Sequence, residues 1–231
     1  GIAISILLVF VKGIAGHLGH SYALIADATE SGADVLSSAL LWIALAVALK
    51  EPDENHPYRH GKAEPVAAMI FSLFLIVAAI WIGYHAIEFI TTPHKLPKEF
   101  TLWVLLFVIA IKELTFRFVM RIGRKINSNA VKADAYHHRS DAITSIAAFI
   151  GISIALIGGK GYEGADDWAA LVASGLILYN AVKIMRPALA EIMDAAPSGE
   201  IVDHVRQLAA GVKEVKNIEK CYVRKMGFDY Y

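Results

Sequence analysis

The feature that most constrains this chain is an apolar run from Pro65 to Ile87 that contains no Asp, Glu, Lys or Arg. A helix that crosses the hydrocarbon core of a bilayer needs about 20 such residues, so this segment alone is long enough to span a membrane. The composition agrees, because 56% of the 231 residues are hydrophobic and 19% are charged. In soluble domains about 45–50% of the residues are hydrophobic and about 25% are charged. The sequence therefore predicts an integral membrane protein.

The charge and cysteine counts exclude several other classes. The 22 basic residues balance the 22 acidic ones, so no net charge favours nucleic acid as a partner. The single cysteine, Cys221, excludes an internal disulfide framework and a cysteine-rich zinc module. Residues 1–11 lack the basic region and cleavage site of a signal peptide. Because residue 1 already lies inside an apolar run, we expect the natural N-terminus to precede it.

Glycine, proline and asparagine residues divide the apolar runs into segments. Several runs are short enough to be core helices of a soluble protein, but each continues into a sparsely charged helical segment. We therefore expect six membrane-spanning helices, over residues 1–18, 22–50, 61–91, 99–125, 130–158 and 165–193.

Basic residues are distributed unevenly between the two sets of connections. The set that includes Lys62 and Arg124 is rich in Lys and Arg, whereas the opposite set carries Lys95, Lys98 and Lys160. Since loops rich in Lys and Arg stay on the cytoplasmic side, we expect both termini to lie in the cytoplasm.

The character of the chain changes after Pro197. Residues 199–212 have amphipathic helical spacing, and residues 218–231 alternate like two strands around Met226 and Gly227. We therefore expect a six-helix membrane domain over 1–196, followed over 197–231 by the start of a small α+β domain. A lone helix and hairpin bury too little surface to be stable, so we expect this domain to continue beyond Tyr231.

The second predicted helix carries three acidic residues on one face: Asp27, Glu30 and Asp34. Each carboxylate inside a membrane span costs about 2.5–3.5 kcal/mol on insertion scales, and the three would repel one another. They therefore need a cation, protons or water. The alternative is a solvated helix end, but apolar stretches of similar length flank the cluster on both sides.

The fifth predicted helix offers complementary ligands. His137 and Asp141 are four residues apart, so they share a helical face one turn apart, as a metal-chelating pair would. The HxxxD spacing alone is weak, and a helix-end histidine with its own partner is a common alternative. Facing Glu30 and Asp34, however, this pair completes four ligands, the number that zinc prefers. His138 lies on a different side of the helix and is not expected to bind metal.

The connection between the second and third helices contains Asp53, His56 and His60. These residues either bind a second cation or belong to an ordinary polar turn, and the sequence leaves both interpretations open. Late in the third helix His85 and Glu88 are interpreted as a structural pair.

The fourth helix is the most charged of the six. Its Lys112, Glu113 and Arg117 either satisfy one another or line an aqueous vestibule in the cytoplasmic half, where long side chains reach water.

Three segments resemble the cation diffusion facilitator family of divalent-metal transporters: HSYALIADATESGADVLSS, DENHPYRHGKAEP and KADAYHHRSDAITS. The resemblance implies a homodimer in the bilayer, in a bacterial cytoplasmic membrane, with six membrane helices and a ferredoxin-like, metallochaperone-like cytoplasmic domain. It implies efflux of a divalent cation by metal/proton antiport, with no resident cofactor and no enzymatic activity. Zn²⁺ is the first expected substrate, and Fe²⁺, Mn²⁺, Co²⁺ and Cd²⁺ are alternatives.

The resemblance also assigns roles to individual residues. The transport site maps onto Glu30, Asp34, His137 and Asp141, although relatives mostly carry His or Asp at the first position, so Glu30 bears on metal selectivity. The loop site of bacterial relatives maps onto Asp53, His56 and His60, and a charge interlock that holds the dimer near the membrane surface maps onto Lys62 and Asp194.

Three other functions use the same residues. A membrane metalloenzyme would need an open metal position and a general base, and the sequence contains no HExxH motif. A non-transporting metal sensor would use metal only to shift its cytoplasmic domains. A carrier of organic cations would not need the paired chelating spacing.

Overall fold

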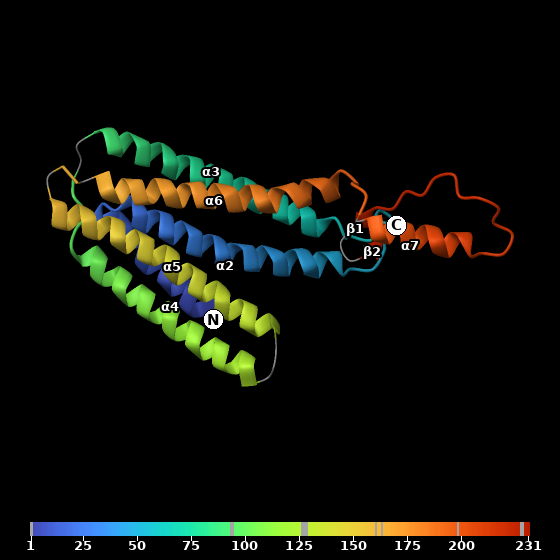
Figure 1. The fold of residues 1–231 in the computed structure, drawn as a ribbon, viewed down its shortest axis with the longest axis horizontal. Helices are drawn as coiled ribbons and strands as arrows, with labels where there is room; N and C mark the ends of the chain where they lie inside the picture. The colour runs from blue at the N-terminus through green and yellow to red at the C-terminus, as the bar shows by residue number, and fades with distance from the viewer. Residues whose placement is uncertain are drawn as a thin grey trace. The chain divides into compact units, whose positions relative to one another are not determined.

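The computed structural model describes residues 2–92, 95–125, 129–159, 161–162, 164–197, 199–226 and 229–231. Among them the chain forms α1 (Ile2–Gly19), α2 (Tyr22–Ala48), α3 (Ala63–Thr91), α4 (Phe100–Lys125), α5 (Asn129–Gly158), α6 (Gly164–Ile192), α7 (Gly199–Ala210), β1 (Lys225–Met226) and β2 (Asp229–Tyr230), as Figure 1 shows. The bounds of α1 to α6 agree with the sequence prediction to within two residues.

Local signals explain where the helices begin and end. Ser21 precedes α2, and its hydroxyl accepts a hydrogen bond of 3.1 Å from the amide of Leu24, as an N-cap residue does. At the C-terminal end of α5 lies Gly159, whose φ of +65° suits glycine. Its amide donates a hydrogen bond to the carbonyl of Ala155. These caps satisfy backbone groups that a membrane cannot hydrogen-bond.

The described chain divides into two compact units, and the division falls within α2, α3 and α6. The first unit comprises residues 1–36 and 75–180, and the second comprises residues 37–74 and 181–231. In the first unit α4 lies alongside α5 over much of its length and also contacts α1 (Figure 1).

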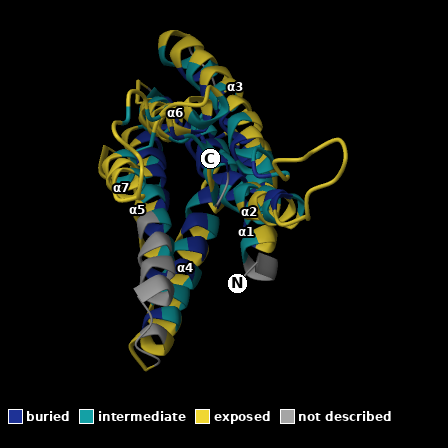
Figure 2. Cartoon of the chain, turned by 90° about the vertical axis from the view of Figure 1, so that its right-hand side faces the viewer, coloured by how far each residue is buried: buried dark blue, intermediate teal, exposed yellow. Residues whose placement is uncertain are grey.

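Apolar residues cover the outside of the helices. On α1, Leu7, Phe10, Ile14 and Leu18 recur every three or four residues and are 56–63% exposed, whereas Lys12 is 0% exposed. Figure 2 shows exposed residues running along α3, a helix whose exposed residues include Ile70, Phe74 and Trp81. An apolar outside with a polar inside is the pattern expected of helices that face lipid.

Among the described residues, four helical segments are long and apolar enough to cross a membrane: Tyr22–Ala48, Ala63–Thr91, Asp141–Gly158 and Gly164–Ile192. The described apolar part of α1, Ser5–Gly19, is shorter. The middle of α4 contains Lys112, Glu113 and Arg117, which keeps it out of this group. These segments support the prediction of an integral membrane protein, while the number of six membrane-spanning helices stays a prediction.

The C-terminal segment belongs to the second unit. The helix predicted over 199–212 is observed as α7, which has no buried residue. β1 and β2 pair antiparallel with Lys225 opposite Tyr230, and two further backbone hydrogen bonds join Arg224 to Tyr231. The prediction of strands from residue 218 onward was wrong for 218–224, because alternation alone makes no strand without a neighbour to pair with.

At Gly151 two helices of the first unit approach each other closely. A Cβ placed on Gly151 of α5 would lie 2.6 Å from the Cβ of Ala169 and 3.1 Å from the carbonyl oxygen of Ala165, both on α6. Small residues that allow backbones to approach are typical of contacts between membrane helices. A methyl group at Gly175 of α6 would meet no atom within 4 Å.

We expect Gly151→Ala to lower the thermal stability of the detergent-solubilised protein by several degrees, because the added methyl must push α5 and α6 apart at a cost of about 1–3 kcal/mol. Gly175→Ala is the matched control, which should leave the melting temperature unchanged or raise it slightly. Equal melting temperatures for the two variants would contradict the close contact.

Candidate metal-transport site

An ion pair between Lys12 on α1 and Asp27 on α2 lies in the interior of the first unit. Nζ of Lys12 is 2.8 Å from Oδ2 of Asp27, and the two side chains are 0% and 3% exposed. The same ammonium group donates to the carbonyl of Asp27 at 3.0 Å and to the hydroxyl of Ser31 at 2.6 Å. From α5, Ser145 donates to the Asp27 carboxylate at 2.9 Å. Both carboxylate oxygens of Asp27 therefore accept hydrogen bonds from protein groups.

A second lysine connects this pair to α5. Nζ of Lys112, on α4, donates to the Ser31 hydroxyl at 3.2 Å and lies 3.6 Å from Oδ2 of Asp141. The Lys112 and Asp141 side chains are 7% and 13% exposed. Ser31 thus accepts a hydrogen bond from each of two ammonium groups. We call this set the buried polar network; its members are Lys12, Asp27, Ser31, Lys112, Asp141 and Ser145.

The predicted transport-site residues border this network. Glu30 and Asp34 are half-buried on α2, one turn apart, and Asp141 is half-buried on α5. Glu30 lies within electrostatic range of both Asp141 and Lys112. The structure thus brings one acidic residue of α2 near Asp141 of α5. The side chain of His137, one turn before Asp141, lies outside the described residues.

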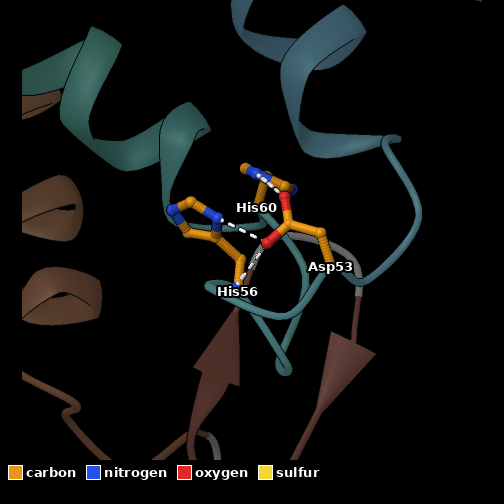
Figure 3. A group of neighbouring side chains, drawn as sticks. All are labelled: Asp53, His56 and His60. Atoms are coloured by element: carbon orange, nitrogen blue, oxygen red, sulfur yellow. Dashed lines mark hydrogen bonds and ion pairs between the residues drawn. The ribbon is translucent and has the colours of Figure 1, made fainter.

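In the second unit, the connection between α2 and α3 brings Asp53, His56 and His60 together (Figure 3). One ligand atom from each lies within 4.8 Å of the others. Oδ1 of Asp53 is 2.9 Å from Nδ1 of His56, and Oδ2 is 3.5 Å from Nε2 of His60. The backbone amides of Asn55 and His56 also donate to Oδ1 of Asp53, which closes the turn.

These contacts set the charge of the cluster. The hydrogen bond from the His56 side chain holds the pKa of Asp53 below its ordinary value, so the carboxylate is ionised at neutral pH. Within the described part of the chain, Nδ1 of His60 is buried and has no hydrogen-bond partner. A carboxylate and two imidazoles within this distance of one another form a donor set that suits a divalent cation.

The residues of the predicted interlock are in contact. Nζ of Lys62, just before α3, is 2.9 Å from Oδ1 of Asp194, just after α6, and both lie in the second unit. The side chain of Arg224 approaches the other carboxylate oxygen at 3.4 Å. The hydrogen bond from Lys62 lowers the pKa of Asp194, which keeps that carboxylate charged.

Other predicted pairs are also observed. Nδ1 of His85 is 3.3 Å from Oε2 of Glu88, and the His85 ring lies against the rings of Tyr22 and Trp81, consistent with a structural role. On α4, Arg117 pairs with Glu113 at 2.7 Å, as one of the two sequence interpretations proposed. Lys112 does not join that pair and instead faces the buried polar network.

The segment from α1 to α6 matches a known protein family. Residues 1–193 match the family described as the cation efflux transmembrane domain. The chain belongs to this family, the cation diffusion facilitators. The match contains both predicted metal sites and the whole of α1 to α6.

Several relatives cover most of this cation efflux chain. The manganese efflux system protein MneP of Bacillus subtilis (strain 168) is 30% identical over 227 residues, which are 96% of this chain and 76% of MneP. The magnetosome protein MamB of Magnetospira sp. (strain QH-2) is 30% identical over 95% of this chain and 74% of MamB. Metal tolerance protein 2 of Oryza sativa subsp. japonica is 30% identical over all of this chain and 66% of its own length.

Sequence reasoning missed the role of Lys12. The available signal was that Lys12 is the one charged residue in the apolar stretch 2–19 and therefore needs a partner. The sequence places its partner Asp27 on one helical face with Glu30 and Asp34 and does not identify Lys12 as the cation that pairs with it. Spacing alone could not distinguish an acid paired within the protein from one that faces a site.

We expect the contact between Lys62 and Asp194 to stabilise the folded chain at pH values above 3.8, the ordinary pKa of Asp. This stabilisation should be lost as the pH falls through the lowered pKa of Asp194 in the folded state. Lys62→Met should therefore lower the melting temperature slightly at neutral pH, and the difference from the unmodified chain should shrink at acid pH. The effect is small because both side chains are half-exposed and screened. Lys213→Met, at another exposed lysine, is the control, and a difference that does not change with pH would contradict the assignment.

Proposed function

We propose that this chain exports a divalent transition-metal cation across a membrane in exchange for protons, with Glu30, Asp34, His137 and Asp141 as metal ligands. The observation that carries the proposal is that Lys112 of α4 contacts both α2 and α5: its ammonium group lies 3.2 Å from the hydroxyl of Ser31, which follows Glu30, and 3.6 Å from the carboxylate of Asp141. Asp34 follows Glu30 by four residues and His137 precedes Asp141 by four, the spacing at which two side chains of one helix can bind the same ion. Membership of the cation efflux family supports the same function.

Mn²⁺ and Zn²⁺ are the leading substrates. Three carboxylates and one imidazole form an oxygen-rich set without thiolate, which suits Mn²⁺ as well as Zn²⁺ and disfavours soft Cu⁺. Two of the relatives, MneP and MneS, are named as manganese efflux system proteins, which favours Mn²⁺. Zinc, predicted from the tetrahedral ligand number, stays the second candidate. Competitive uptake of Mn²⁺, Zn²⁺ and Fe²⁺ by one proteoliposome preparation decides between them.

Exchange with protons follows from the charges of the site. Carboxylates that crowd one another in a poorly solvated site hold protons, and a divalent cation binds only to carboxylates and imidazole that have released theirs. Metal binding from one side of the membrane would therefore expel protons, which re-enter the empty site from the other side. His137 is the proposed proton carrier because imidazole titrates nearest physiological pH. Rocking of the helices around the site would provide alternating access.

We further propose that Asp53, His56 and His60 bind a second cation outside the transport path. The half-exposed positions of Asp53 and His56 allow a metal ion to exchange with solvent. The proposed working form is a homodimer in a cytoplasmic membrane with both termini inside, where Lys62 and Asp194 brace the ends of α3 and α6. The excess of Lys and Arg in one set of connections supports that orientation.

We expect Asp141→Asn to reduce metal-driven proton movement in proteoliposomes by more than about tenfold, since the amide keeps the volume of the side chain but removes its charge. A pH-sensitive dye inside the vesicles reports the proton flux after Mn²⁺ or Zn²⁺ is added outside.

Glu113→Gln is the matched control for this experiment, because Glu113 pairs with Arg117 on α4 and lies away from the site. It should transport at the unmodified rate. Full activity of Asp141→Asn, or equal loss in both variants, would argue against the proposed site.

If Asp53, His56 and His60 bind a second cation, removing their ligands should change the number of metal ions bound per chain rather than the rate of transport. Replacing His56 and His60 together by Ala should remove about one bound Mn²⁺ or Zn²⁺ per chain, measured by titration of the purified protein with the metal alone, because a lone exposed carboxylate binds such ions weakly. The rate of metal-driven proton movement should fall less than about threefold. An unchanged number of bound ions would show that the two histidines hold no metal.

A further inference from the structure

We propose that Lys112 sets the metal affinity of the transport site by offsetting one of its three carboxylate charges. The inference rests on the proposed function and adds to it a residue that is not itself a ligand. Lys112 would keep metal binding weak enough for release.

The position of Lys112 is fixed by its contacts. Its ammonium group lies 3.6 Å from the Asp141 carboxylate and donates to the Ser31 hydroxyl at 3.2 Å. Ser31 is held in turn by Lys12 at 2.6 Å, and Lys12 is fully buried. Lys112 therefore cannot leave the site without breaking contacts to two helices other than its own.

The side chains around the proposed transport site carry charges of both signs. Lys12 and Asp27 neutralise each other at 2.8 Å. The remaining described charges around Glu30 are Asp141 and Lys112, and Asp34 follows one turn along α2. The Lys112 ammonium group, 3.6 Å from Asp141, therefore offsets part of the negative charge that the carboxylates bring to the proposed site.

Lys112 also opposes the ion that the site binds. A cation held by Asp141 lies close to the ammonium group, and like charges at this distance in a poorly solvated interior repel each other strongly. Removing the ammonium should therefore tighten binding and slow release. A lysine that only ties α4 to α2 would instead lower stability when replaced and leave metal affinity unchanged.

The test compares Lys112→Gln, Glu30→Gln and the double variant in the full chain. Mn²⁺ and Zn²⁺ affinities are measured at one fixed pH by titration in detergent, and transport by proteoliposome flux. We expect Lys112→Gln to bind Mn²⁺ at least about tenfold more tightly, with KM and the maximal transport rate both reduced. Glu30→Gln should bind about tenfold more weakly, and the double variant should return to within about threefold of the unmodified chain, because it removes one positive and one negative charge.

Two controls separate charge from structure. Lys112→Arg keeps the charge and should leave affinity within about threefold, whereas Arg117→Gln removes an exposed charge five residues further along α4 and should have no effect. If Lys112→Gln does not fold, Lys112→Met, which keeps the apolar stem of the lysine but removes its charge, replaces it in the same comparison.

The outcomes distinguish the two proposals. Unchanged or weaker binding in Lys112→Gln, or a double variant no tighter than Glu30→Gln, would overturn the role of Lys112 while leaving the transport function intact. An unmodified chain that neither binds nor moves Mn²⁺ or Zn²⁺ would overturn the proposed function itself.

Discussion

A charged side chain inside a membrane-spanning helix bundle needs an opposite charge and hydrogen-bond partners, and in this chain the contact between Lys12 and Asp27 supplies both. The two groups are 2.8 Å apart and buried. Either one alone would be strongly destabilising in the interior, because an unpaired buried charge loses its hydration without compensation. The contact joins α1 to α2.

The polar residues of α2 then divide into two neighbouring stripes. Asp27 and Ser31 are four residues apart and both accept hydrogen bonds from Lys12. Glu30 and Asp34 are also four residues apart and lie one residue before and three residues after Ser31. One stripe contacts α1 and α4, and the other carries the two residues of α2 that we propose as metal ligands. A one-residue offset along the helix separates the two roles.

Much of the helical architecture could be predicted from the sequence, because long apolar runs and their Gly and Pro boundaries are local signals. The partner of Lys12 could not, since Asp27 lies 15 residues away, beyond the turn between α1 and α2. From the sequence, Asp27, Glu30 and Asp34 form one acidic cluster on one helical face. The contact with Lys12 shows that Asp27 has a partner on another helix. The loop cluster of Asp53, His56 and His60 was predictable because its members are close in sequence. The strands were overestimated because pairing depends on a neighbouring segment.

The two proposed metal sites place their donors in opposite surroundings. In the loop cluster, Asp53 and His56 are half-exposed, so water screens their charges and affinity depends on ligand geometry. Beside Asp141, the ammonium group of Lys112 lies 3.6 Å away and both side chains are largely buried, so a single charge changes affinity far more. A transporter must release the ion it binds, and ligands alone would favour tight binding. The lysine beside Asp141 is the feature of this fold that works in the opposite direction.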